Sequence, residues 1–178
     1  MRDAIKASIR TIPDYPKKGI QFRDISTLLE DSKALRMTVD TIVHRYMNEN
    51  ISAVAGIEAR GFIFGTVVAY ELGASFIPIR KAGKLPGDTI SQSYQLEYGE
   101  DSIEVHKNCV HKGARILLID DLIATGGTAA AAITLLRQLE ANIIESCFVV
   151  DLPDLGGSKK LVTELDCPVF ALCEFAGD

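Results

Sequence analysis

Apolar positions in the first fifty residues follow helical spacing. Isoleucines at steps of three and four predict a short N-terminal helix over 5–12, which Pro13 ends. Residues 14–19 are rich in turn-forming types. A longer run of apolar residues at steps of three and four predicts a second helix, from a cap at 31 or 32 to about Asn50.

From residue 52 onward, strand patterns alternate with helix patterns. The expected strands cover 52–57, 75–79, 116–119, 143–150 and 168–173, and the expected helices cover 62–72, with Gly73 as a stop, 129–141 and 158–165. Segments 90–98 and 102–107 alternate apolar with polar residues, which is typical of an antiparallel hairpin. This order predicts an α/β fold: one mostly parallel sheet flanked by helices in a single domain, 1–178, with both chain ends forming a small hood over it.

The most informative strand is Ile116-Leu117-Leu118-Ile119, which runs directly into two acids, Asp120 and Asp121. Four consecutive aliphatic residues indicate a strand buried on both faces, as in a parallel sheet. Open α/β sheets bind their ligands at the carboxyl ends of such strands. We therefore expect these acids to lie in a functional site.

A loop of small residues follows the acids and precedes a helix. It consists of Ala124, Thr125, Gly126, Gly127 and Thr128. Glycines permit close backbone approach, the threonines add hydroxyl donors, and the free N–H groups of the helix start favour an anion, so the loop is suited to a phosphate. The preceding acids would repel that phosphate, so we expect them to accept hydrogen bonds from sugar hydroxyls instead. Together the two elements predict a site for a ribose 5-phosphate.

Composition agrees with one soluble domain. The chain has 178 residues, of which 47% are hydrophobic and 24% charged, and it has no apolar run of the roughly 20 residues that span a bilayer. Its start lacks the apolar segment of a signal peptide, and its cysteines lack metal-ligand spacing, so we expect a cytoplasmic protein with reduced thiols and no membrane partner.

The net charge of −5 disfavours a general nucleic-acid surface, and no such partner is expected. A polyanionic substrate must then meet a local cluster of cations. No Gly-x-x-x-x-Gly-Lys-Ser/Thr or Gly-x-Gly-x-x-Gly motif is present in the sequence.

The segment from Ile116 to Thr128 resembles the 5-phosphoribosyl 1-pyrophosphate (PRPP) signature of the type I phosphoribosyltransferases. The resemblance implies their fold and a pyrophosphate site at Ala59, Arg60 and Gly61, where a second strand turns into a helix. The alternative is a surface arginine that pairs with Glu58.

A basic loop, Arg80-Lys81-Ala82-Gly83-Lys84-Leu85-Pro86, follows the next strand, and Ser93-Tyr94-Gln95-Leu96-Glu97-Tyr98-Gly99 follows that loop. Both segments are similar to the hood-closing loop of the adenine phosphoribosyltransferase family. The resemblance implies a flexible loop over about 80–103, in which Arg80, Lys81 and Lys84 close over pyrophosphate. It also implies that Glu97 stabilises the cationic transition state or assists proton loss from the base.

The segment from Gly19 to Ser26 resembles the base-binding segment of the same family. By this resemblance Phe22 and Leu152 cover the two faces of a purine, and the backbone of Gln21 reads its amine. Arg23 bridges the base and the loop, or instead pairs with Asp24 or Glu97. The hood would comprise about 1–30 and 150–178.

The family resemblance implies that adenine and PRPP react to give AMP and pyrophosphate in purine salvage. Mg²⁺ would enter with PRPP and have no direct protein ligand. The family resemblance implies a homodimer, which the apolar run 62–64 could serve unless it is buried within one subunit. Two alternatives stay open: transfer to another purine base, and a non-catalytic PRPP-binding regulator.

Overall fold

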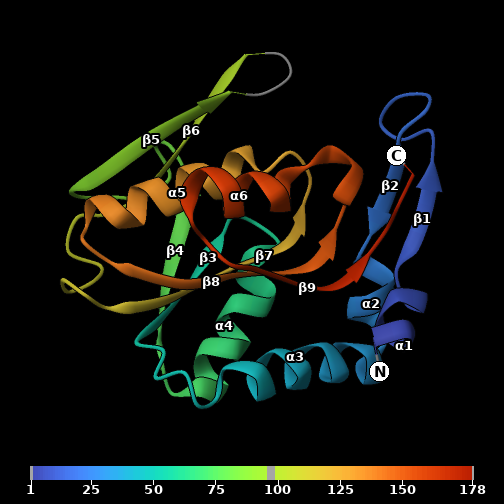
Figure 1. Cartoon of the computed structure of the whole chain (residues 1–178), viewed down its shortest axis with the longest axis horizontal. Coiled ribbons are helices and arrows are strands. Elements are labelled where there is room, and N and C mark those ends of the chain that lie inside the picture. The colour runs from blue at the N-terminus through green and yellow to red at the C-terminus, as the bar shows by residue number, and fades with distance from the viewer. Residues whose placement is uncertain (1, 96–98, 178) are drawn as a thin grey trace.

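The computed structural model describes residues 2–95 and 99–177, which form a central sheet with helices on both sides (Figure 1). The strands are β1 (Arg10–Pro13), β2 (Gln21–Asp24), β3 (Ala53–Ile57), β4 (Ser75–Lys81), β5 (Thr89–Gln95), β6 (Glu100–His106), β7 (Arg115–Ile123), β8 (Asn142–Asp151) and β9 (Val169–Glu174). The helices are α1 (Arg2–Ala7), α2 (Ser26–Glu30), α3 (Ser32–Tyr46), α4 (Gly61–Leu72), α5 (Gly127–Gln138) and α6 (Gly157–Leu165), and a 3-10 turn covers Pro153–Leu155.

The main sheet has seven strands in the order β5-β6-β4-β3-β7-β8-β9. Strands β4, β3, β7, β8 and β9 are parallel, whereas β6 pairs antiparallel with both β4 and β5. The expected α/β class, the mostly parallel sheet and the antiparallel hairpin are confirmed.

Both faces of the central strands are buried, because successive side chains point to opposite sides of a sheet. On β7, Ile116 and Leu118 pack in a cluster with α5 and α6, while Leu117 and Ile119 pack in a second cluster with α1 to α4. All four side chains are fully buried. This explains the unbroken aliphatic run that the sequence shows before its two acids.

Two small antiparallel units lie at opposite ends of the sheet (Figure 1). At one end the β5–β6 hairpin extends beyond the parallel strands, and at the other β1 and β2 form a separate two-stranded sheet. The second unit corresponds to the N-terminal part of the expected hood. In the C-terminal part, β9 is an edge strand of the main sheet, and the segment after it reaches the hood.

The N-terminal helix is shorter than predicted. It ends at Ala7, and 10–13 form β1, in which Ile12 pairs with Phe22 and Pro13 with Gln21. The helical spacing of the three isoleucines was misleading here. Residues 10–13 hydrogen-bond to β2, and the spacing of apolar residues within one segment does not reveal such a partner strand. The helix expected from residue 31 or 32 is confirmed as α3, with Asp31 as its cap: the carboxylate accepts the N–H groups of Lys33 and Ala34.

The signature strand is longer than predicted and includes both acids. Strand β7 continues to Ile123 because it pairs with β8 as far as Ile123 and Asp151, whereas its pairing with β3 stops at Ile119. Helix α5 then begins at Gly127 and ends at Gln138, before the expected end at residue 141. The last residues of β7, including both acids, therefore extend beyond the end of β3 and form a step in the carboxyl edge of the sheet.

No helix within the described ranges is long and apolar enough to cross a membrane.

Replacing Phe64 of α4 by Ala should lower the free energy of unfolding by about 3–5 kcal/mol, because this fully buried ring packs against β7 and leaves a cavity. Urea denaturation followed by circular dichroism measures the change. Val162→Ala on α6, at a side chain that is 49% exposed, is the control and should change the value little. Equal losses in both variants would contradict this account of the core.

Candidate active site

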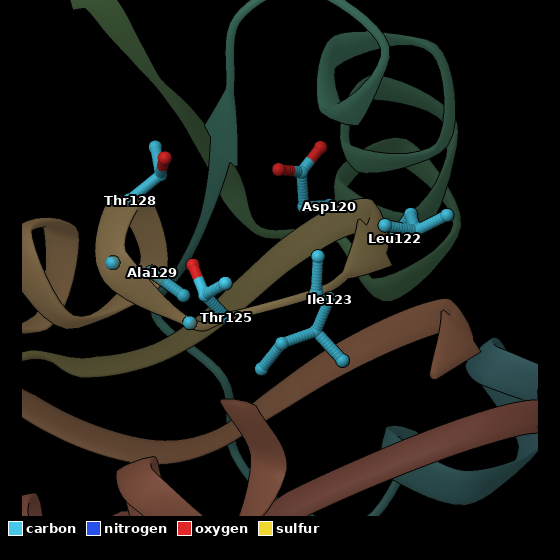
Figure 2. A pocket seen from close by; sticks show the side chains of 9 residues that line it. Asp120, Leu122, Ile123, Thr125, Thr128 and Ala129 are labelled. Carbon is cyan, nitrogen blue, oxygen red and sulfur yellow. The ribbon is translucent and has the colours of Figure 1, made fainter. Parts of the chain in front are cut away.

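A cavity of about 120 Å³ opens where β7 turns into α5 (Figure 2). Its lining is continuous in sequence apart from Asp121, and comprises Asp120, Leu122, Ile123, Ala124, Thr125, Gly126, Gly127, Thr128 and Ala129. Figure 2 shows the carboxylate of Asp120 and the hydroxyl groups of Thr125 and Thr128 around the same space. Six of the seven residues that the sequence assigned to ribose phosphate thus line one cavity.

The shape of this loop depends on a close contact with the start of α6. Gly157 donates its N–H to the carbonyl of Ala124 at 3.0 Å. A Cβ on Gly157 would lie 2.3 Å from that carbonyl oxygen and 2.7 Å from the nitrogen of Gly126, so only glycine fits. Gly126 itself has φ +77°, a left-handed conformation that glycine adopts without a steric penalty.

Electrostatics at the loop favour an anion. Helix α5 starts at Gly127, and its first N–H groups have no partner within the helix. Their partial positive charge and the hydroxyl groups of Thr125 and Thr128 surround the cavity. A phosphate monoester satisfies both kinds of donor.

The two acids are held in place by different contacts. Asp120 accepts the N–H of Asp121 at 2.9 Å, and its carboxylate lies so close to Gly61 that a Cβ there would be 2.9 Å from Oδ1. Desolvation raises the pKa of Asp120 well above that of an ordinary carboxyl, and the adjacent Asp121 raises it further. Burial also raises the pKa of Asp121, although Arg60 opposes that change. Ligand hydroxyls that donate to these oxygens would replace part of the lost hydration.

Arg60 connects three parts of the site. Its Nε lies 2.9 Å from Oδ2 of Asp121, and its guanidinium lies 5.8 Å from the centre of the Phe22 ring. The turn before α4, the acids of β7 and strand β2 of the hood therefore meet at one arginine. The alternative pairing of Arg60 with Glu58 is wrong.

Glu58 instead binds two cations of the basic loop. Its carboxylate lies 3.2 Å from the Arg80 guanidinium and 2.9 Å from the Lys84 ammonium, and it accepts the N–H of Lys81 at 3.0 Å. The Arg80 guanidinium in particular lowers the pKa of Glu58 to about 2, so this carboxylate is ionised at neutral pH. The ammonium of Lys81 lies 3.1 Å from Asp101 on β6.

The hood places one predicted base-binding residue beside the site and another away from it. The Phe22 ring lies near Arg60 and makes an edge contact with Tyr15 at 5.2 Å between ring centres. Neighbouring strand residues point to opposite faces, so Arg23 points the other way. It donates to Thr11 and to the carbonyl of Gly177, and its guanidinium lies over the Phe175 ring.

The predicted pairing of Arg23 with Asp24 is therefore wrong, because Asp24 binds Arg10. The alternative pairing with Glu97 lies outside the described residues, and the contact of Arg23 with a base stays a prediction. Gln21 is partly buried on the same short strand.

Leu152, predicted to cover one face of the base, directly follows β8. It is 8% exposed and packs in the core cluster on the α3–α4 side of the sheet, so its contact with a base stays a prediction. Leu122 lines the cavity and packs against the same cluster. The sequence missed Leu122 because the strand was expected to end before it.

Glu97 lies outside the described residues. Two residues before the gap, however, lie near the loop 124–128: a Cβ on Gly127 would be 3.5 Å from the carbonyl of Gln95 and 3.8 Å from the Tyr94 ring. Tyr94 also donates to Asp101 at 3.3 Å. The described end of β5 thus adjoins the start of α5.

The sequence did not identify Glu58 and Asp101 as partners of the basic loop. Charge balance was the available signal, because a cluster of cations in a chain of net charge −5 has nearby acids with which to pair. Among the described residues there is no cluster of three or more side chains that could hold a metal ion.

Comparison with known proteins gives consistent results. The model of the phosphoribosyl transferase domain matches residues 27–173. The chain is similar to an adenine phosphoribosyltransferase of Bradyrhizobium sp. (strain BTAi1), with 58% identity over 173 residues that cover 97% of this chain and 96% of the relative.

Two solved structures show the same likeness. Adenine phosphoribosyltransferase from Thermoanaerobacter pseudethanolicus has a TM-score of 0.92 at 42% identity, covering 98% of this chain and 100% of that one. The enzyme from Saccharomyces cerevisiae, in complex with an imino-altritol bisphosphate and adenine, has a TM-score of 0.90 at 38% identity and covers 97% and 98% of the two chains.

Replacing Gly157 by Ala should weaken the binding of ribose 5-phosphate by about tenfold or more, since the new methyl group must displace the Ala124 carbonyl and distort the loop. Isothermal calorimetry measures the affinity. Lys159→Ala, two residues further along α6, is the matched control and should bind as the wild type does. Unchanged binding in Gly157→Ala would show that the loop geometry does not determine affinity.

Proposed function

Because the chain belongs to the phosphoribosyltransferase family, and within it to the adenine phosphoribosyltransferases, we propose that it transfers the 5-phosphoribosyl group from PRPP to adenine. The products are AMP and pyrophosphate, and the reaction is one of purine salvage. The whole chain, 1–178, would form one functional domain.

The cavity at the start of α5 is the observation that carries this proposal. It combines anion donors with an adjacent pair of acids, which suits a phosphorylated pentose. The yeast relative, similar to this chain over 97% of its length, was crystallised with adenine and a sugar-like bisphosphate, which are two ligands of the same chemical classes.

The 5-phosphate of PRPP would bind the loop from Ala124 to Thr128. The ribose hydroxyls would then lie beside Asp120 and Asp121, where they donate to carboxylate oxygens that have little contact with water. Arg60 must leave Asp121, or share it, when that diol binds.

The pyrophosphate would bind the turn Ala59-Arg60-Gly61 together with Arg80, Lys81 and Lys84. This assignment is supported by the arrangement of β3 and β4, which are neighbouring parallel strands that end at the same edge of the sheet. The four cations therefore lie on one side of the acids, next to the site of the departing group.

Adenine would stack on Phe22, with the backbone of Gln21 reading its exocyclic amine. The contact of Phe22 with Arg60 supports this position, because it brings the ring next to the ribose acids. Leu152 would cover the opposite face, and Leu122, which lines the neighbouring cavity and packs against the same core cluster, is a second candidate.

The chemistry requires no nucleophilic side chain. Displacement at the anomeric carbon passes through an oxocarbenium-like transition state, so positioning, charge neutralisation and stabilisation of a transient cation suffice. Glu97 is our candidate for stabilising that cation or for assisting proton loss from adenine, and Lys81 and Lys84 would close over the departing pyrophosphate.

Mg²⁺ would enter with PRPP, held by pyrophosphate and ribose oxygens, without a direct protein ligand. Oxygen donors of this kind match the preference of the ion, and its charge would offset that of the leaving group. We also propose a cytoplasmic location, which agrees with four free cysteines, three of them buried.

We propose a homodimer that forms through α4. Ile63, Val67 and Tyr70 lie along one face of this helix and are 40%, 43% and 82% exposed. A groove of about 340 Å³ is lined by Ile63 and Val67 together with Leu35 and Val39 of α3. An apolar face of this kind suits a two-fold interface, in which each subunit offers the same surface.

The proposed activity predicts that the protein converts adenine and PRPP to AMP and pyrophosphate when Mg²⁺ is present, as measured by the absorbance change on nucleotide formation. Hypoxanthine, guanine and xanthine, tested in parallel, should react far more slowly. Faster transfer to one of those bases would change the substrate assignment. PRPP binding without any product would instead indicate a regulator.

The proposed interface predicts that Val67→Glu shifts the protein from dimer to monomer, because the new carboxylate would be buried without a partner. Light scattering after size-exclusion chromatography gives the mass. Val162→Glu, at a similarly exposed valine on α6, is the control and should remain dimeric. A dimer in both variants would place the interface elsewhere.

A further inference from the structure

Every cation of the proposed pyrophosphate site is already paired with a carboxylate in the described residues. Arg60 pairs with Asp121 at 2.9 Å, Arg80 and Lys84 with Glu58 at 3.2 and 2.9 Å, and Lys81 with Asp101 at 3.1 Å. An anion that binds these cations must therefore compete with carboxylates that already occupy them.

Glu58 differs from the other two acids because it binds two of the cations at once. Its side chain is 11% exposed, and the backbone N–H of Lys81 donates to it as well. Glu58 N–H in turn donates to Ile79 at 2.9 Å, which fixes the end of β3 against β4. Glu58 thus directly precedes the turn Ala59-Arg60-Gly61 in the chain, while its carboxylate binds Arg80, near the end of β4, and Lys84, which follows β4.

We propose that Glu58 is a positioning residue that exchanges Arg80 and Lys84 with pyrophosphate, and so limits how tightly the product is held. This inference rests on the proposed function, since it assigns those cations to the leaving group. It adds a role for a carboxylate that the reaction itself does not use.

Binding of pyrophosphate replaces one set of contacts by another. When pyrophosphate binds, it gains the two cations, but Glu58 loses them while remaining largely shielded from water. A shielded carboxylate that loses partners carries a cost that opposes binding. The cost is modest, because the side chains of Arg80 and Lys84 are 34% and 50% exposed.

Glu58 also stays charged throughout this exchange. The Arg80 guanidinium and the other donors around it lower its pKa to about 2, so protonation does not release the cations at neutral pH. Only a competing anion does so. After transfer, the carboxylate can take both cations back as pyrophosphate leaves.

A purely structural role makes the opposite prediction. If Glu58 served only to order the basic loop, its loss would scatter Arg80 and Lys84 and weaken the binding of pyrophosphate. Glu104 provides a matched comparison on the same loop. It is 5% exposed and accepts the backbone N–H groups of Lys84 and Leu85 at 3.1 and 2.9 Å, but no side-chain cation pairs with it.

The test compares Glu58→Gln with Glu104→Gln by calorimetric titration of the wild type and both variants with magnesium pyrophosphate, in the absence of any base. We expect Glu58→Gln to bind about threefold to tenfold more tightly than the wild type. Glu104→Gln, which only loosens the loop, should bind more weakly. Unchanged or weaker binding by Glu58→Gln would overturn the proposal.

Thermal unfolding establishes that each variant is folded at the assay temperature. If Glu58→Gln does not fold, Glu58→Asp replaces it, because the shorter carboxylate keeps the charge but reaches the two cations less well. It should bind pyrophosphate more tightly than the wild type, and weaker binding would contradict the exchange. AMP formation by the wild type is measured separately, so a failure of the proposed function is distinguishable from a failure of this inference.

Discussion

The burial of β7 on both faces is the constraint on which the rest of the structure depends. Ile116 and Leu118 belong to one core cluster, and Leu117 and Ile119 to the other, so the strand has neither freedom to shift register nor a solvent-exposed face. Because β7 extends beyond the end of β3 but stays paired with β8, its last residues form a step at the carboxyl edge of the sheet. The acids and the phosphate loop occupy that step, and their positions follow from the core beneath them.

Close backbone contacts complete the site. Gly61 allows the turn before α4 to approach Asp120, and Gly157 allows α6 to support the phosphate loop. Both contacts join segments that are distant in sequence, and neither tolerates a side chain. Packing therefore fixes the relative positions of the turn 59–61, the two acids of β7 and the loop 124–128 before any ligand arrives. This is the preorganisation that the proposed catalysis by positioning requires.

The sequence revealed the parts of this site that are local and missed those that depend on tertiary pairing. An aliphatic strand, two acids and a small-residue loop are contiguous, so the cavity from Asp120 to Thr128 could be predicted. The strand at 10–13 was missed because its partner, β2, has to be known first. The alternation along β2, which turns Arg23 toward Gly177 and away from Phe22, became visible only once that strand was established.

The distribution of charge shows why the ion pairs between cations and acids at this site matter. A chain of net charge −5 that handles a polyanion needs a local surplus of cations, yet the cations at this site are all engaged by acids of the described chain. Such pairing keeps the ligand-free site close to neutral, and it turns the binding of an anion into an exchange of partners. The free energy of anion binding is then the difference between the contacts that the cations gain with the anion and those that they lose with the acids. If these cations bind the leaving group as proposed, a transferase that must release pyrophosphate after each turnover benefits from that arrangement, because a site of unpaired cations would retain its product.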